Sequence, residues 1–478
     1  MEGTEYKTKC DILRHAQESI GIPLGEIDST GRLKTGKGAI GTVLEESWFG
    51  YSPNSEAEPD FPEAEVELKA TPYIRTKNGI SAKERLVCNI INYMTEYDKT
   101  FETSDFWHKC KNILIMSYEH KDNVPKADYT IDKAVLFSFP IEDLIIIEQD
   151  WNKIIQKIKE GKAHLLTEGD TLYLAACTKG ADSSSVRPQP FSTEPAKQRA
   201  YSLKTKYMTY ILRSYIFGNK QDPHVVTDWH ILLDEEKSIT IETDNTSLNT
   251  DEAVIKDWHA LTDTSFEDVV VNMIRPYYGR TVSQLALQFG IQSKAKNINE
   301  LILSRMLGVT GKVNNTKEFQ NANIITKTIR VNHDGSITES MSFPTFKFLE
   351  IIDETWETSK LRNYIEPAKF LFIIFKEDDD GEYKLERVKF WNIPYEDLEE
   401  LHRVWDRTVS IIKEGVVLEE RNNKTYNNLP KSTESRVAHV RPHARDASDT
   451  YPLPDGRSMP KQCFWFNNSY LESIINND

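Results

Sequence analysis

The chain has 478 residues, of which 39% are hydrophobic and 10% aromatic, so it is too apolar for a disordered protein and long enough for two or three domains. Its net charge of −15 argues, taken alone, against a nucleic-acid partner, and no apolar run approaches the roughly 20 residues that span a bilayer. The N-terminus lacks the apolar core of a signal peptide, and the five cysteines have no C-x-x-C spacing, so we expect a reduced cytoplasmic protein without disulfides, zinc site or membrane association.

The first half of the chain alternates helical and strand-like patterns. Helical periodicity covers 10–20, 39–49, 140–161 and 205–217, and strand-like runs cover 65–70, 86–91, 112–118 and 133–139. Strands interleaved with helices in this order predict an α/β fold in which a central mixed sheet is flanked by helices. Two further strands are expected at 370–375 and 385–391.

Charge is distributed unevenly along the chain. Residues 173–220 hold eight Lys or Arg against two acids, and residues 231–271 hold eleven acids against two lysines. A basic stretch of this kind is compatible with a DNA-binding surface, although a chance cluster on a solvated surface explains it equally well.

An internal repeat divides the chain. PIEDLIIIEQDWNKIIQKIKEG (140–161) and PYEDLEELHRVWDRTVSIIKEG (394–415) share 9 of 22 residues without a gap, and FETS (101–104) matches WETS (356–359). Both long segments are typical of a loop that enters an amphipathic helix, with Trp151 and Trp405 expected in the core. A period of about 255 residues is too long for a solenoid and indicates a duplicated domain.

Glycines and apolar positions extend the repeat toward the N-terminus at a spacing of 258 residues. We therefore predict two halves of similar architecture, residues 1–218 and 262–478, joined by an acidic linker at 219–261.

The stretch PDFPEAEVELKAT (59–71) carries a possible catalytic pattern. Side chains two apart on a strand share a face, so Glu67 and Lys69 point the same way, with Asp60 seven residues before Glu67. Phosphodiester hydrolysis needs a hard cation such as Mg²⁺ held by carboxylates, an activated water and a positive group near the reacting phosphate. The spacing matches the nuclease signature PD-(D/E)xK. A solvated charge pair on an exposed strand is the alternative.

Several motifs occur in an order that strengthens the nuclease interpretation: KGAIGTVLEESWFG (37–50), PDFPEAEVELKAT, FETSDFWHKCK (101–111) and LAACTKGADSSS (174–185). Together they resemble the MutH-type mismatch-repair endonuclease, which is similar to the type II restriction endonucleases that cut GATC. The whole chain looks like the restriction branch of that family. The resemblance implies a restriction-endonuclease-like mixed sheet, present twice, a Mg²⁺ cofactor and GATC-containing double-stranded DNA as the substrate, cut 5′ of the guanine.

The resemblance also assigns roles to individual residues. Asp60, Glu67 and Glu45 match metal-binding acids, Lys69 matches the catalytic lysine, and Lys37 matches a lysine near the site. Expected DNA contacts are Lys109 near the cleavage point, Lys179 at guanine, Ser202 where the repair enzyme has a tyrosine, Arg187 and Lys204 of the basic stretch, and Arg441 and His443 of the second half. Glu46 adjoins Glu45, so the sequence does not decide which of the two matches the acid of the early helix.

The second half lacks most of the catalytic set. Its counterparts of Glu45 and Glu67 are Leu303 and Ile325, whereas those of Asp60 and Lys69 are Glu318 and Lys327. Apolar side chains cannot coordinate Mg²⁺, so this half is expected to be inactive and to bind a second GATC copy or to regulate the first. Retention of the half for packing alone is the alternative.

These observations favour a type II restriction endonuclease that is a monomer in solution and can pair on DNA. A repair nickase and a non-catalytic GATC-binding regulator are the other function classes. The duplicated half argues against the first, and the intact Asp60–Glu67–Lys69 set against the second.

Overall fold

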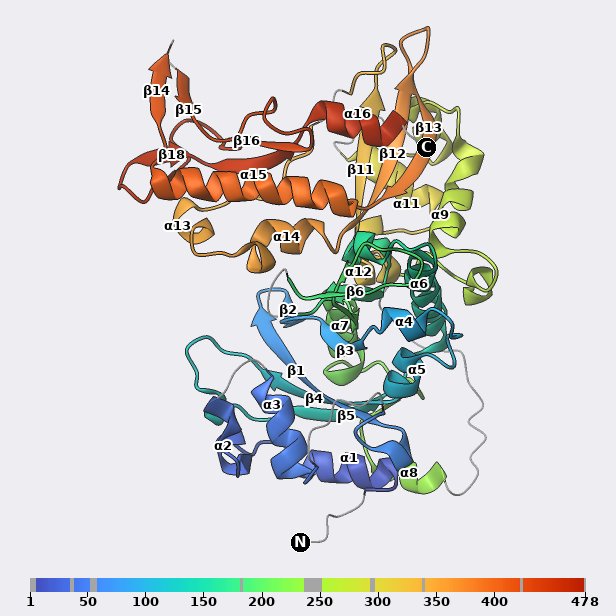
Figure 1. The fold of residues 1–478 in the computed structure, drawn as a ribbon. Coiled ribbons are helices and arrows are strands. Elements are labelled where there is room, and N and C mark those ends of the chain that lie inside the picture. Colours follow the sequence, from blue (N-terminus) through green and yellow to red (C-terminus); the bar gives the residue numbers. More distant parts are fainter. Residues whose placement is uncertain are drawn as a thin grey trace. The chain divides into compact units, whose positions relative to one another are not determined.

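The computed structural model describes residues 6–34, 38–51, 58–180, 184–235, 252–292, 297–337, 340–421 and 424–476. The chain forms two compact units (Figure 1). Unit 1 comprises Met1–Leu166, Asp170–Ser265 and Thr316–Asn323, and unit 2 comprises Thr167–Gly169, Phe266–Asn315 and Ile324–Asp478. In the part of the chain that is described, no helix combines the length and apolarity needed to cross a membrane.

Unit 1 is built on a five-stranded mixed sheet, as the sequence predicts. Its strand order is β10 (Val225–Val226), β5 (Lys133–Phe137), β4 (Ile113–Glu119), β1 (Glu67–Thr76) and β2 (Gly79–Ala82). Strands β1 and β4 are parallel, with Glu67 opposite Ile113, and the other neighbours are antiparallel.

Helices α1 (Lys9–Glu18) and α3 (Ala39–Val43) cover one face of this sheet with a common apolar core. Leu68 of β1 points into this core together with Leu114 and Met116 of β4. Because side chains alternate along a strand, Glu67 and Lys69 lie on the opposite face. The predicted helix at 39–49 continues beyond α3 as a π-helical turn, Leu44–Trp48.

A second, three-stranded sheet in unit 1 has the order β3 (Leu86–Ile90), β9 (Arg199–Leu203), β6 (Leu174–Thr178). The long predicted helix is α6 (Ile141–Lys159), with Trp151 2% exposed. The remaining helices and strands of this unit are α2 (Leu24–Ile27), α4 (Tyr93–Glu96), α5 (Asp105–Cys110), α7 (Thr205–Ile211), α8 (His230–Glu235), α12 (Lys317–Asn321), β7 (Val186–Arg187) and β8 (Ala196–Lys197).

Unit 2 contains a three-stranded mixed sheet with β11 (Ile324–Val331) parallel to β12 (Lys369–Glu377) and β12 antiparallel to β13 (Tyr383–Trp391). A large apolar core, which includes Trp405, packs this sheet against α15 (Tyr395–Glu414). Its other helices are α9 (Phe266–Ile274), α10 (Val282–Gln288), α11 (Ile298–Met306), α13 (Phe348–Ile351), α14 (Lys360–Ile365) and α16 (Asn468–Asn476). Three strand pairs complete the unit: β14 (Leu418–Arg421) with β15 (Lys424–Asn427), β16 (Ala438–Pro442) with β19 (Gln462–Phe466), and β17 (Thr450–Pro452) with β18 (Ser458–Pro460).

The two units repeat one order of elements. With β2, β3 and the strand pairs β7–β8, β14–β15 and β17–β18 set aside, each unit has a strand, two short helices, a strand parallel to the first, an antiparallel strand, a long helix, an antiparallel strand pair and a further helix. In unit 1 this order is β1, α4, α5, β4, β5, α6, β6, β9 and α7, and in unit 2 it is β11, α13, α14, β12, β13, α15, β16, β19 and α16. This shared order supports a duplication.

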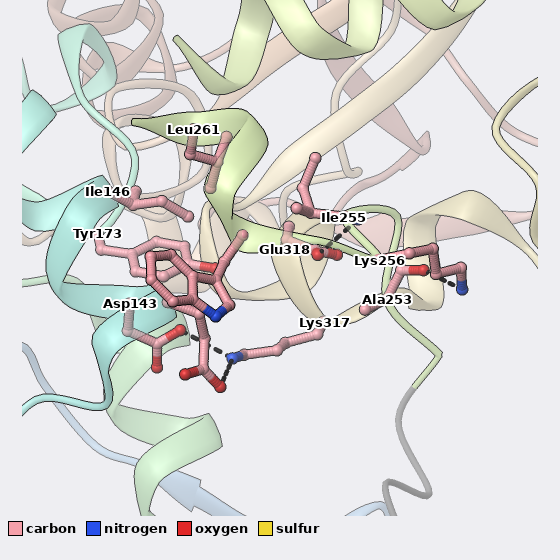
Figure 2. Close-up of a pocket in the computed structure, with 11 residues that line it drawn as sticks. Asp143, Ile146, Tyr173, Ala253, Ile255, Lys256, Leu261, Lys317 and Glu318 are labelled. Atoms are coloured by element: carbon pink, nitrogen blue, oxygen red, sulfur yellow. Dashed lines mark hydrogen bonds and ion pairs between the residues drawn. The ribbon is translucent and has the colours of Figure 1, made fainter. Parts of the chain in front are cut away.

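One segment of the second half of the sequence, Thr316–Asn323, belongs to unit 1. Figure 2 shows how Lys317 of this segment reaches Asp143 near the start of α6. Lys317 Nζ lies 2.8 Å from Asp143 Oδ1 and 3.2 Å from Glu142 Oε1, and Asp143 is 1% exposed. The ion pair lines a pocket of about 170 Å³ together with Tyr173 and Trp258.

Burial sets the electrostatics of this ion pair. Burial alone would lower the pKa of Lys317, but Asp143 and its neighbours raise it well above its usual range. The pKa of Asp143 is raised by burial, against the opposing effect of Lys317. Each charge therefore depends on the other for compensation.

Replacing Lys317 with alanine should destabilise unit 1 by about 3 kcal/mol, because Asp143 would be left as an uncompensated buried charge. Without Lys317 the folded-state pKa of Asp143 rises further above its unfolded value of about 3.9. The variant therefore loses stability as pH rises through that pKa, and the deficit should be larger at pH 8 than at pH 5. Urea unfolding at both pH values measures this effect.

Lys256→Ala is the matched control, because this lysine lines the same pocket but is exposed and bonds only the Ala253 carbonyl among the described residues. It should change stability by no more than about 0.5 kcal/mol. Equal effects of the two substitutions would contradict an anchoring role for Lys317.

Candidate active site

A tight loop places Asp60 next to Glu67. Phe61 and Val66 pair as an antiparallel bridge around the short 3₁₀ turn Pro62–Ala64, and Glu65 closes the loop with a left-handed φ of 55°. Phe61, Val66 and Leu68 are buried in the core of unit 1. The apolar side chains hold the loop, so the two carboxylates converge at the start of β1.

The Glu67 carboxylate is the centre of the cluster. Its Oε1 lies 2.6 Å from Lys69 Nζ and 3.5 Å from Lys109 Nζ. Its Oε2 accepts a hydrogen bond from the Asp60 backbone N–H at 3.2 Å, and Asp60 Oδ2 accepts one from the Leu68 N–H at 2.9 Å. Two acids and two lysines from β1, its preceding loop and α5 are therefore linked through one carboxylate.

Burial perturbs the ionisable groups of this cluster. Glu67 is 2% exposed, and burial together with Asp60 raises its pKa to about 7 against the opposing effects of Lys69 and Lys109. Burial lowers the pKa of Lys69, but Glu67 more than offsets this, so the pKa lies above its usual range. Such perturbed groups cluster at functional sites more often than elsewhere.

Of the two adjacent acids of the early helix, Glu45 interacts electrostatically with the cluster. Burial and Asp60 raise the pKa of Glu45, whereas Lys69 and Lys109 lower it, which puts Glu45 within electrostatic reach of the cluster. Glu46 instead pairs with Arg32 at 2.7 Å. Lys37 lies outside the described residues.

The donors around Glu67 suit a hard cation. Within the described ranges, no three His, Cys, Asp or Glu side chains are arranged as a metal site. Asp60, Glu67 and Glu45 nevertheless offer only carboxylate oxygens, the donor type that Mg²⁺ prefers over Cys and His ligands. The chemistry of the donor set therefore fits Mg²⁺.

Unit 2 contains an altered counterpart of this cluster. Ile325 and Lys327 occupy β11 where Glu67 and Lys69 occupy β1. Lys327 has no ion pair with any described residue, and burial alone lowers its pKa. Glu318, the counterpart of Asp60, accepts hydrogen bonds from Val254 N–H at 2.9 Å and Ile255 N–H at 3.0 Å within unit 1. Ile325 has no carboxylate, and the carboxylate of Glu318 is bound to backbone N–H groups of unit 1. The start of β11 therefore lacks the carboxylate pair found at the start of β1.

The expected DNA contacts of unit 1 differ in exposure. Lys179, at the end of β6, is exposed, as is Arg187, whose Nε donates to Gln198. Ser202 is 1% exposed and donates to the Ala175 carbonyl, and Lys204 is 3% exposed and donates to the Thr171 carbonyl. The structure thus keeps Lys179 and Arg187 available and gives no support to direct contacts from Ser202 and Lys204.

In unit 2, Arg441 is an exposed residue of β16 that stacks on Trp465 of β19, with 3.7 Å between the guanidinium carbon and the ring centroid. His443 lies 3.1 Å from Cys463 through its Nδ1. An exposed guanidinium held against a half-buried aromatic ring is a group that can reach phosphates or bases.

Sequence reasoning missed one contributor to the site and one contact within it. The Cys88 carbonyl lies 3.4 Å from Lys69 Nζ, and a backbone acceptor leaves no sequence signal. The contact of Lys109 with Glu67 joins residues far apart in the chain, so the motif FETSDFWHK locates Lys109 but does not reveal its partner.

Known proteins resemble this chain along its whole length. The family described as the DNA mismatch repair enzyme MutH matches two separate segments, residues 49–150 and 307–403, which is consistent with duplication. The type II restriction enzyme Sau3AI of Staphylococcus aureus is 37% identical over 98% of this chain and 99% of its own length. The DNA mismatch repair proteins MutH of Shewanella woodyi and Escherichia coli are 29% and 28% identical over 44% and 43% of this chain, and over 94% and 92% of their own lengths.

A relative with this identity over nearly the entire chain establishes the family. The MutH proteins correspond in extent to one half of the chain, whereas Sau3AI corresponds to both halves. The chain belongs to the family of Sau3AI-like type II restriction enzymes, which are related to the MutH mismatch-repair enzymes.

Proposed function

We propose that this enzyme hydrolyses double-stranded DNA at GATC, 5′ of the guanine, in a Mg²⁺-dependent reaction carried out by a restriction-endonuclease-like active site in unit 1. The observation that carries the proposal is the cluster of Asp60, Glu67, Lys69 and Lys109 at the start of β1. The GATC sequence and the position of the cut come from the family resemblance.

The side chains of the cluster have distinct tasks in this proposal. Asp60 and Glu67 would hold Mg²⁺, which would supply Lewis-acid stabilisation of charge on the phosphate. Lys69 orients the attacking water and offsets developing negative charge, because its ammonium group is fixed 2.6 Å from Glu67 Oε1. The Leu68 N–H fixes the orientation of the Asp60 carboxylate. Lys109 places a second positive charge at the same carboxylate, and Glu45 adds a third acid.

Unit 2 is proposed to bind a second GATC duplex without cutting it. Ile325, and Lys327 with no ion pair to any residue that the structure describes, argue against catalysis there. Arg441, stacked on Trp465, supplies a pre-oriented guanidinium of the kind that reads guanine or binds phosphate. With one active centre, a chain cuts one strand at a time, so double-strand cleavage requires two chains on DNA or successive nicks.

Digestion of a GATC-containing plasmid with purified full-length protein and Mg²⁺ tests this function. Discrete GATC-length fragments are the expected products. Nicked circles would indicate the repair-nickase alternative, which the MutH relatives make relevant. Intact plasmid would indicate a non-catalytic regulator.

Replacing Lys69 with alanine should slow single-turnover cleavage of a GATC duplex at least about 100-fold, because a group that offsets transition-state charge is lost. Binding of the same duplex should change little, since Lys69 lies in a buried cluster. Rapid-quench cleavage and a gel shift in Ca²⁺ measure the two effects.

Lys327→Ala is the matched control, because Lys327 occupies the corresponding strand position in unit 2 without a carboxylate partner among the described residues. Its cleavage rate on a duplex with one GATC should stay within about twofold of the parent. Full activity of the Lys69 variant would remove this lysine from the mechanism.

In a full-length Lys69→Ala background, which prevents cutting, each chain should bind two short GATC duplexes. Adding Arg441→Ala should weaken the second binding event about tenfold or more, as expected for loss of an arginine contact. Sedimentation titration with labelled duplex counts the bound molecules. Arg403→Ala is the control, since Arg403 is exposed on α15 and pairs with Glu400. One duplex per chain in every variant would contradict a second site.

A further inference from the structure

Unit 1 contains a buried carboxylate outside the catalytic cluster. Glu96, the last residue of α4, is 0% exposed. Its Oε2 lies 3.2 Å from Lys99 Nζ and 3.4 Å from the Asp105 backbone N–H. Its Oε1 accepts long hydrogen bonds from Trp151 Nε1 at 3.4 Å and Tyr201 OH at 3.5 Å. One side chain thus joins α4, the first turn of α5, the middle of α6 and strand β9.

This carboxylate lies at one end of α5, and the catalytic cluster lies at the other. Asp105, which begins α5, donates its N–H to Glu96 and pairs with Lys99 through its side chain. Lys109, four residues and about one turn further on, lies 3.5 Å from Glu67 through its Nζ. A shift of the first turn of α5 therefore moves Lys109 relative to Glu67.

The second half of the chain shows that the corresponding helix forms without this carboxylate. At a spacing of 255 residues, Glu96 corresponds to Ile351 and Lys109 to Tyr364, and Ile351 ends α13 as Glu96 ends α4. The Ser104 cap of α5 is retained as Ser359, which caps α14. Trp151 is retained as Trp405, whose buried Nε1 has no hydrogen-bond partner among the described residues. The helix forms there without the buried acid, and the indole loses its acceptor.

Burying a carboxylate is costly unless its lone pairs are filled, and unit 2 avoids that cost with isoleucine. The acid is present only in the unit that also has Lys109 and Glu67. Glu96 therefore occurs together with Lys109 and Glu67, whereas α13, the counterpart of its helix α4, forms without a buried acid.

We propose that Glu96 is a positioning residue for DNA cleavage: it fixes the first turn of α5 to α6 and β9, so that Lys109 stays at the Glu67 carboxylate. The proposal rests on the proposed cleavage function and adds to it a residue that touches neither DNA nor metal. It assigns to Tyr201 and Trp151 the task of holding Glu96, which explains why a buried acid accepts from two aromatic donors.

The test uses full-length protein, a duplex with one GATC and single-turnover cleavage at saturating enzyme. Glu96→Ile, which copies the residue of unit 2, should slow cleavage about tenfold or more, in line with the cost of misplacing a catalytic group. Glu96→Gln, which keeps one of the two acceptor oxygens and places an NH2 group at the other, should slow cleavage by an intermediate factor, less than Glu96→Ile. The Kd for the same duplex, measured in Ca²⁺, should change less than about twofold in both. Equal rates for the two variants, or a loss found only in Kd, would overturn the proposal.

A double-mutant cycle with Lys109→Gln separates positioning from a general loss of stability. If Glu96 acts through Lys109, Glu96→Ile should slow cleavage less than about threefold when Lys109 is already replaced. The same slowing factor in both backgrounds would overturn the proposal. If Glu96→Ile does not fold, Glu96→Asp, which withdraws the carboxylate by one methylene, takes its place under the same two criteria.

Asp150→Asn is the matched structural control. Asp150 is, like Glu96, a fully buried carboxylate, and it lies on α6. It accepts hydrogen bonds from the N–H groups of Leu172, Tyr173 and Leu174 at 2.6–2.9 Å. Its replacement should lower the thermal midpoint, and any effect on cleavage should be the same with and without Lys109. Coupling to Lys109 as strong as that of Glu96 would show that any loss of packing moves Lys109, which would also overturn the proposal.

Discussion

The cost of burying the Glu67 carboxylate is the constraint on which the active unit depends. A charge that is 2% exposed must be compensated by neighbouring charges and donors. The compensation comes from Lys69 on the same strand face, from Lys109 on α5 and from the Asp60 N–H. Each of these needs its own support, which the loop before β1, the parallel pairing of β1 with β4 and the capped helix α5 provide.

Unit 2 shows how the fold relaxes when that charge is removed. With Ile325 in place of Glu67, Lys327 retains its strand position but has only burial acting on its pKa. The buried acid of α4 becomes Ile351, and the lysine of α5 becomes Tyr364. The sheet order and the long helix survive these changes. Apolar packing therefore sets the backbone architecture of this protein. The cluster of Glu67, Lys69 and Lys109 is found in unit 1, and the architecture does not require it.

The sequence predicts the parts of the fold that follow from local periodicity. The strands at 65–70, 112–118 and 133–139 and the helix at 140–161 appear as β1, β4, β5 and α6 with boundaries shifted by a few residues. The placement of Glu67 and Lys69 on one face of β1 also follows from a local pattern, the alternation of side chains along a strand. These successes need no information about contacts between distant parts of the chain.

Contacts between distant residues could not be predicted in this way. The family resemblance places Ser202 and the basic stretch places Lys204 near a DNA surface, but neither says which way a side chain points, and both are buried in the structure. The ion pair of Lys109 with Glu67 and the four donors around Glu96 arise from the packing of separate elements. Chain order likewise assigns 316–323 to the second half, although its contacts place it in unit 1.

That segment also bears on the history of the chain. Since Lys317 compensates the buried Asp143 of α6, the first copy no longer contains every charge that its own interior requires. A gene shortened to the first half would encode a protein with an exposed gap and an unmatched acid. Loss of the second half of the sequence would therefore be selected against through the folding of unit 1 alone, whatever that half contributes to function.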